Sequence, residues 1–471
     1  MPLFRESSFL VVHPGSQHTI FSFGLQDPLS PPQYKIPSVV YQDPNTKEYK
    51  SKKNEGEELI EVHPIKESRI VDLDAFNYLL KIILQSVITN NPVITINQIP
   101  LLLIAPSLAW SRSNIEYVTK YVIESLEFTA FNVIDLSIAC NFGMGSSSSS
   151  CVVNIGHESC QIMPVIGYQS IKYAGIYLNG IGGKTINEEV QKLLPNLTGK
   201  QIEALKTSGI FEAVNDHDSS FYSVADLNTI GENNEDDEDF DVAKIVTEQN
   251  GNLPKSESEA NQGEEDKQEE KSNSELEKNF FLDPDTKEKI YVGKERFQGV
   301  SKLVNRVAEA IYESLLLIPD LEKRQECYDN LIFVGSTFKI PGLKQALLIK
   351  LTADYLVRSP GESTANDETT AVNSAIVAYQ QAEELNESNG ESNFILSQVP
   401  TAIRAAKHPD YFPEWKQPKE KGGSWEDVYF LGAEIYAKQI FGGNSNQGGE
   451  LFLDADGYEE KGPQGIWDAT I

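Results

Sequence analysis

Long apolar stretches are missing from this chain of 471 residues. No run approaches the ~20 apolar residues that a membrane-spanning helix requires. The first residues, MPLFRESSFLVV, also lack the charged start, apolar core and small-residue cleavage site of a secretory signal. We therefore expect an intracellular, soluble protein with no membrane partner.

Cysteine and positive charge are also scarce. The four cysteines form no CxxC motif and no Cys/His pair at metal-ligand spacing, which disfavours a disulfide framework or a zinc site and predicts buried free thiols at Cys140, Cys151, Cys160 and Cys327. With 40 basic and 70 acidic side chains, the formal net charge is -30. Because this charge would repel a phosphate backbone, direct nucleic-acid binding is disfavoured, whereas basic protein partners fit it.

The apolar residues that are present, 40% of the chain, are enough for more than one core, so we expect two lobes. Residues 9–24 and 151–166 each show an apolar strand, a glycine turn and an alternating second strand, the pattern of a hairpin. Gly15 and Gly156 lie 141 positions apart in these turns, which suggests two related halves. Any half-buried hairpin has this pattern, so the sequence leaves duplication and coincidence both open.

Strands and helices alternate between the two hairpins. Asp72 is placed to cap a helix with apolar residues at helical spacing, and residues 100–107, PLLLIAPS, predict a strand buried on both faces. Ser113 and Glu116 then match a capping box before a second amphipathic helix. This alternation favours an α/β architecture.

Two segments have the composition of insertions. Residues 215–279 are acidic, polar and poor in aromatics, which predicts disorder because little surface can be buried there. The segment is either a solvated spacer or a contact for a basic partner such as a histone. Residues 346–395 predict a second insertion on the surface.

Several segments, in the correct order, resemble the actin family. The two hairpins correspond to its two phosphate loops, VGKERFQG at 292–299 is similar to a GxERF stretch, and LIFVGSTFKIPG at 331–342 corresponds to the adenosine loop. YFLGAEIYAKQIF and YEEKGPQGIW resemble the closing helix and tail of actin. AKHPDYFPEWK at 406–416 is unlike conventional actin and is similar to the nuclear, chromatin-associated members of the family.

The resemblance implies an actin-like α/β fold, in which duplicated ribonuclease-H-like halves form two lobes around a central cleft. It also implies the domain boundaries, which are a first lobe at 1–145 with a small mobile lobe at about 33–69, a second lobe at 146–345 with the acidic disordered insertion at about 215–279, a surface insertion at 346–395, and a return to the first lobe at 396–471.

The family's nucleotide pocket falls on nine positions of this chain, namely His13, Gly15, Ser16, Asn154, Gly156, His157, Gly182, Gly335 and Ser336. Hydrolysis of ATP in this fold needs carboxylates around hydrated Mg²⁺ and a group that orients water. The acidic positions of the two loops hold His13, Asn154 and His157, while Glu158 adds a negative charge beside the phosphate position. The pocket is therefore interpreted as vestigial.

Other family positions have also lost their chemistry. The lysine, the water-orienting glutamine, the hinge aspartate and the base-flanking aromatic correspond to Ile20, Leu136, Asn179 and Ile340, and Pro14 removes a backbone donor. Because losing one preorganised electrostatic group already lowers a rate about 100-fold, we expect no catalytic residue, no enzyme activity and no cofactor. We expect His13 and His157 to hydrogen-bond locally and not to hold a metal. Weak ATP binding through backbone amides at Gly15 and Gly156 stays open.

The resemblance implies a structural role in a chromatin-remodelling complex in the nucleus. An apolar groove would bind the helix that precedes the motor domain of a SWI/SNF-type remodelling ATPase, through Phe142, Tyr168, Tyr436 and Phe441. These aromatics could equally be core residues. The implied partners are actin-related protein 7 as heterodimer mate, a small stabilising subunit and, indirectly, the nucleosome. The alternatives are an ATPase that still cycles nucleotide, a self-assembling filament subunit, and a histone-binding subunit that uses the acidic insertion.

Overall fold

The computed structural model describes residues 8–24, 31–54, 56–91, 99–145, 148–213, 273, 275–357, 399–409, 412, 415, 424–442 and 451–469. Most of both predicted insertions lies outside these residues. The described residues at the edges of the two insertions form regular structure. Strand β15 (Asn279–Leu282) begins where the acidic insertion was expected to end, and helix α10 (Leu343–Tyr355) extends into the expected surface insertion. Leu343, Leu347 and Leu351 of α10 are buried in the core, which is why this part of the chain is helical.

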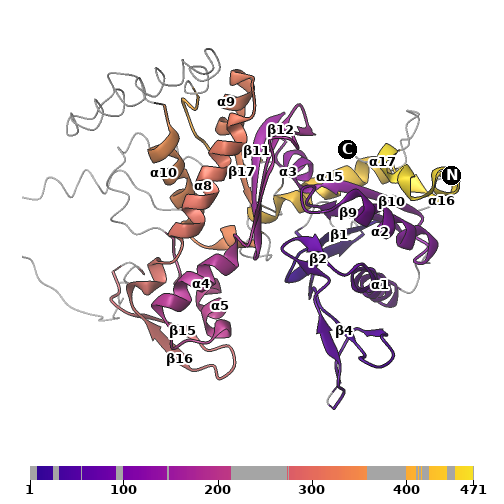
Figure 1. Cartoon of the computed structure of the whole chain (residues 1–471), viewed down its shortest axis with the longest axis horizontal. Coiled ribbons are helices and arrows are strands. Elements are labelled where there is room, and N and C mark those ends of the chain that lie inside the picture. The colour runs from indigo at the N-terminus through magenta and orange to yellow at the C-terminus, as the bar shows by residue number, and fades with distance from the viewer. Residues whose placement is uncertain are drawn as a thin grey trace, which may run out of the picture.

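A six-stranded sheet forms the first lobe (Figure 1). Its strands, in spatial order, are β18 (Leu453–Asp454), β10 (Ala130–Asp135), β9 (Pro100–Ala105), β1 (Leu10–Pro14), β2 (His18–Phe23) and β3 (Tyr34–Pro37). β1, β2 and β3 pair in antiparallel fashion, whereas β1 and β10 are parallel to β9. All six residues of β9 are buried, as the continuous apolar run predicts.

The sheet of the second lobe repeats this arrangement. Its strands are β13 (Gln169–Ser170), β12 (Ser159–Ile166), β11 (Ser149–Ile155) and β17 (Leu331–Val334), with β14 (Ile176–Asn179) also paired to β12. β11 is antiparallel to β12 and parallel to β17, as β1 is to β2 and β9. Gly15 and Gly156 occupy the equivalent first turns. The duplicated α/β fold is thus confirmed.

Smaller elements extend from both lobes. They are the sheet of β4 (Val40–Gln42), β5 (Tyr49–Lys50) and β6 (Ile60–Val62), the hairpin of β7 (Ile65–Lys66) and β8 (Arg69–Ile70), β16 (Lys289–Val292) paired with β15, and the 3-10 helices η3 (Lys294–Phe297), η4 (Ser336–Lys339), η5 (Trp425–Asp427) and η6 (Gly462–Gly465).

Helices cover both sheets. They are α1 (Leu73–Asn90), α2 (Arg112–Glu124), α3 (Leu136–Met144), α4 (Gly183–Leu193), α5 (Gly199–Thr207), α8 (Ser301–Leu316), α9 (Leu321–Asp329), α10, α15 (Val428–Phe441), α16 (Ala455–Lys461) and α17 (Ile466–Ala469). Asp72 caps α1 as predicted. The predicted Ser113–Glu116 capping box is wrong, because α2 starts earlier and Ser111 accepts the hydrogen bond from the N–H of Asn114. No described helix has the length and apolar character needed to cross a membrane.

Two crossed helices, α3 and α15, lie between the sheets (Figure 1). They meet at glycines: a Cβ on Gly432 would lie 1.7 Å from the carbonyl oxygen of Ala139, and one on Gly143 would lie 2.4 Å from that of Val428. The core around them includes Leu102 of the first sheet and Val152 of the second. This layer therefore joins the two lobes.

The C-terminal part of the chain returns to the first lobe later than expected. Residues 399–406 still belong to the second lobe, where Ala405 forms a parallel bridge with Leu331 beside β17. The return begins with α15 and is completed by β18, which pairs with β10. The other lobe boundaries remain predictions. All four cysteines are buried and free, as expected.

Candidate functional site

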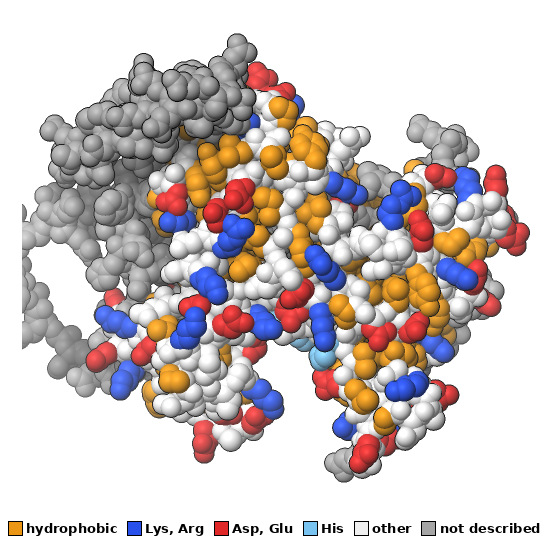
Figure 2. Space-filling model, in the orientation of Figure 1, with side chains coloured by type: hydrophobic (Ala, Val, Ile, Leu, Met, Phe, Trp, Pro, Cys, Tyr) orange, Lys and Arg blue, Asp and Glu red, His pale blue; other side chains and the backbone are white. Residues whose placement is uncertain are grey.

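The cleft between the lobes is the candidate site, and Figure 2 shows it as a notch that opens between them. The two glycine turns at its inner end bond to themselves. The N–H of Gly15 donates to the His18 carbonyl at 3.1 Å, and that of Gly156 donates to the Ser159 carbonyl at 2.9 Å. Each of these two amides is therefore already hydrogen-bonded within its own turn.

His13 is packed into the protein beside the first turn. Its Nδ1 lies 3.4 Å from the carbonyl oxygen of Ile104, and its ring centroid lies 4.7 Å from that of Tyr429 in α15. Burial lowers the pKa of His13 to about 4, against the opposing effects of the Ile104 bond and Asp427. The ring is therefore neutral at pH 7 and is engaged with the protein's own groups.

The second glycine turn packs closely against the start of η4, where the resemblance places the adenosine loop. The carbonyl of Gly156 accepts from the N–H of Gly183 at 3.0 Å and from Thr337 Oγ1 at 2.9 Å. Gly335 has a φ of 103°, and a Cβ there would lie 2.7 Å from Asn154 Oδ1. The structure thus brings Asn154, Gly156 and Gly335 together.

Gly182 and His157 complete this cluster. A Cβ on Gly182 would lie 2.6 Å from the His157 carbonyl oxygen, and that carbonyl accepts from the N–H of Lys184 at 2.7 Å. Ser336 follows Gly335 at the start of η4 and is exposed. The described residues contain no group of three or more His, Cys, Asp or Glu side chains that could hold a metal ion.

A buried lysine beside this cluster was not predicted from the sequence. Lys206 of α5 donates to Glu203 at 2.8 Å and to the Gly183 carbonyl at 3.3 Å. Burial lowers the pKa values of Lys206 and His157, and the positive charge of Lys206 lowers that of His157 further. The spacing of Glu203 and Lys206 was visible in the sequence, but such pairs usually lie on exposed helix faces.

Three of the four remaining substituted positions carry apolar side chains. Leu136 is fully buried, Ile340 is 6% exposed, and Ile20 lies directly opposite His13 on β2. Asn179 is exposed at the end of β14. The ATP·Mg²⁺ of the family therefore does not fit these residues: the acidic ligands are replaced, His13 and His157 in their place are half-buried, and Glu158 accepts a hydrogen bond from the N–H of Glu67.

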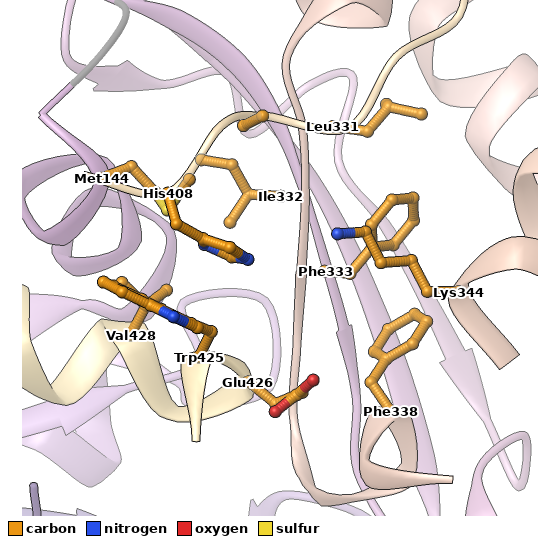
Figure 3. Close-up of a pocket in the computed structure, with 11 residues that line it drawn as sticks. Met144, Leu331, Ile332, Phe333, Phe338, Lys344, His408, Trp425, Glu426 and Val428 are labelled. Atoms are coloured by element: carbon orange, nitrogen blue, oxygen red, sulfur yellow. The ribbon is translucent and has the colours of Figure 1, made fainter. Parts of the chain in front are cut away.

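A second, enclosed space lies between β17 and η5 (Figure 3). The Lys344 amine, the Glu426 carboxylate and the His408 ring, which stacks on Trp425 at 4.5 Å, point toward it. Burial lowers the pKa of Lys344 and raises that of Glu426. The cavity volume is about 20 Å³, which has room for about one water molecule and is too small for a nucleotide.

Three of the four predicted groove residues form one aromatic stack. The ring centroid of Phe142 lies 6.3 Å from that of Tyr168 and 5.7 Å from that of Tyr436. Tyr168 is 46% exposed, whereas Tyr436 is 3% exposed, so the stack runs from the surface into the core. Phe441 is not part of it: this side chain is 1% exposed and packs against Phe9 and Phe452.

Fold and cleft together define a class of protein: a two-lobed α/β chain with duplicated halves and a nucleotide-type cleft whose polar groups bond to one another. The family model for actin matches residues 4–384, and the chain belongs to the actin family. The resemblance that the motifs indicated is thereby confirmed.

Two relatives are informative. The chain is 24% identical over 544 aligned residues to "SWI/SNF and RSC complexes subunit arp9" of Schizosaccharomyces pombe, with 99% of each chain covered. It is 32% identical over 90 residues to "Actin-like protein ARP8" of Saccharomyces cerevisiae, which covers 19% of this chain and 10% of the relative.

Proposed function

We propose that this chain is a non-catalytic, structural actin-related subunit of an ATP-dependent chromatin-remodelling complex in the nucleus. The observation that carries the proposal is the similarity to a SWI/SNF and RSC subunit over 99% of both chains. Because a shared fold alone does not fix function, the state of the cleft is the second support.

The absence of catalysis is proposed from the chemistry of the cleft. A neutral imidazole at His13 and an amide at Asn154 are poor ligands for hydrated Mg²⁺, and a negative Glu158 would repel phosphate. We expect no phosphate release from ATP·Mg²⁺ above that of a heat-inactivated sample. Sustained hydrolysis that depends on His13 or Asn154 would instead favour a cycling ATPase.

The proposed partner site is the aromatic stack of Tyr168, Phe142 and Tyr436. A gradient from an exposed to a buried aromatic suits the anchoring of an amphipathic helix. The proposed ligand is the helix before the motor domain of a SWI/SNF-type ATPase, bound as a heterodimer with actin-related protein 7 and a small stabilising subunit. Contact with the nucleosome would be indirect.

Capture by an immobilised motor-subunit helix tests the groove. Tyr168→Asp should weaken capture at least tenfold, because it places a charge on the exposed end of the stack. Tyr291→Asp is the matched control, since Tyr291 is 63% exposed on β16 in the second lobe. Equal capture of the two variants would contradict the proposed groove.

A further inference from the structure

The turn between β7 and β8 lies in the cleft and has an unusual backbone. Its two residues, Glu67 and Ser68, have φ values of 51° and 60°. This left-handed region is disfavoured for residues that carry a Cβ, and two-residue turns of this type usually contain glycine or asparagine. A strained backbone persists where the surrounding structure holds it in place.

Ser68 is bonded to the first lobe. Its N–H donates to Ser16 Oγ, in the first glycine turn, at 3.0 Å. Its carbonyl accepts from the indole N–H of Trp110 at 3.0 Å. Both backbone polar groups of Ser68 are therefore held by residues around β1 and β9.

Glu67 is bonded to the second lobe. Its N–H donates to Glu158 Oε2 at 2.9 Å, and its carbonyl accepts from the hydroxyl of Tyr177. The Ser68 hydroxyl adds a hydrogen bond of 2.8 Å to Ser159 Oγ. All four backbone polar groups of the turn are thus satisfied, two by each lobe.

Neighbouring contacts support the same junction. The Arg69 guanidinium lies 4.8 Å from the centroid of the Tyr177 ring. The N–H of Leu108, after β9, donates to Gln161 Oε1 of β12 at 3.3 Å. Contacts between the lobes at the cleft therefore extend beyond the turn itself.

We propose that the Glu67–Ser68 turn, with Glu158 and Ser159, forms an internal clasp that keeps the cleft closed without nucleotide. In this clasp, the Glu158 carboxylate and the hydroxyls of Ser16 and Tyr177 hydrogen-bond to the backbone of the Glu67–Ser68 turn, where the two glycine turns meet. The clasp makes lobe closure a property of the polypeptide. A phosphate group entering there would have to displace these bonds and approach the Glu158 charge.

Hydrogen exchange at the Glu67 amide tests the clasp in the full-length protein. Glu158→Ala removes the acceptor, so exchange at this amide should accelerate on the order of tenfold or more. Glu158→Gln keeps an acceptor oxygen and should accelerate exchange less. Glu459→Ala, an exposed carboxylate on α16, is the control and should leave this amide unchanged.

Small-angle scattering reports the second consequence. The double variant Glu158→Ala/Ser68→Ala should have a larger radius of gyration than the wild type, because the lobes separate. Unchanged exchange and unchanged scattering would overturn the proposal.

A third test uses only the wild-type protein, so its result does not depend on whether a variant folds. Millimolar ATP·Mg²⁺ should change neither the thermal midpoint nor the exchange at Glu67 and Ser68. A nucleotide-induced rise in the midpoint, with altered exchange at the turn, would show that nucleotide closes the cleft and would overturn the clasp. This result is separate from helix capture, so the clasp and the proposed function can fail independently.

Discussion

Glu434 is a carboxyl group placed inside the helix layer between the lobes. It is 4% exposed on α15, and its Oε2 has no hydrogen-bond partner within the described part of the chain. Burial raises the pKa of Glu434 from 4.5 to about 8. The folded protein therefore keeps a proton on this residue at neutral pH that the unfolded chain has already released.

Stability should consequently fall as pH rises between these two pKa values. The native state binds more protons in this window, so the contribution of Glu434 is fully present below about pH 4.5 and decreases by about 1.4 kcal/mol per pH unit up to about pH 8. Glu434→Gln should match the wild type in thermal midpoint at pH 5 and exceed it at pH 8.5. Parallel pH curves for wild type and variant would contradict this, and the exposed Glu459→Gln provides the control.

At the scale of elements, the crossing of α3 and α15 depends on a glycine. A Cβ on Gly432 would lie 1.7 Å from a carbonyl oxygen of the facing helix, so Gly432→Ala must push the helices apart. We expect a loss of about 3 kcal/mol or more in urea unfolding. Gly199→Ala on α5 meets nothing within 4 Å and should be neutral or stabilising by less than about 1 kcal/mol. Similar losses in both variants would show that the close approach is unimportant.

Local patterns predicted the elements well. Both glycine hairpins, the buried strand β9 and the Asp72 cap follow from periodicity and capping within a few residues. The capping box at Ser113 failed because a competing serine, Ser111, caps the helix two residues earlier in the same local sequence. Neighbouring residues alone do not decide between two such caps.

Contacts between distant segments were not predictable in this way. The packing of His13 on Tyr429 joins residues at opposite ends of the chain, and the Glu67–Ser68 turn meets Glu158 only after both lobes have formed. The resemblance to actin relatives placed Phe441 in the groove, whereas its side chain is 1% exposed and lies in the core. The residue types therefore predicted the chemistry of the site, whereas tertiary packing determines which of these side chains are exposed to a ligand or partner.

At the scale of the whole molecule, the two ends of the segment 214–272 are tied together. The Asn273 amide donates to the carbonyl of Ile210 and to Glu212 Oε1, and the buried Arg296 donates to the Asn273 carbonyl. The N–H of Glu212 in turn donates to the Arg296 carbonyl. The described residues on either side of this segment therefore lie next to each other in the second lobe.

Replacing residues 214–272 with a short Gly/Ser linker should leave the thermal midpoint within about 2 °C, because loop closure between adjacent ends requires little ordering. Arg296→Ala should lower the midpoint of both the full-length and the shortened protein. Capture by immobilised histones, compared between the two lengths, separates a spacer from a histone contact. Loss of cooperative unfolding in the shortened protein would contradict the prediction that this segment can be removed without destabilising the fold.

The pairing of β18 with β10 has a consequence for biosynthesis. Strand β10 is made early, but among the described residues its outer edge is covered by Leu453–Asp454, which come much later in the sequence, and the core behind it also needs the later helix α15. A nascent first lobe on the ribosome thus exposes a strand edge and an apolar face until α15 and β18 have been made. Chaperone protection during synthesis should therefore matter for this lobe until β18 can pair with β10.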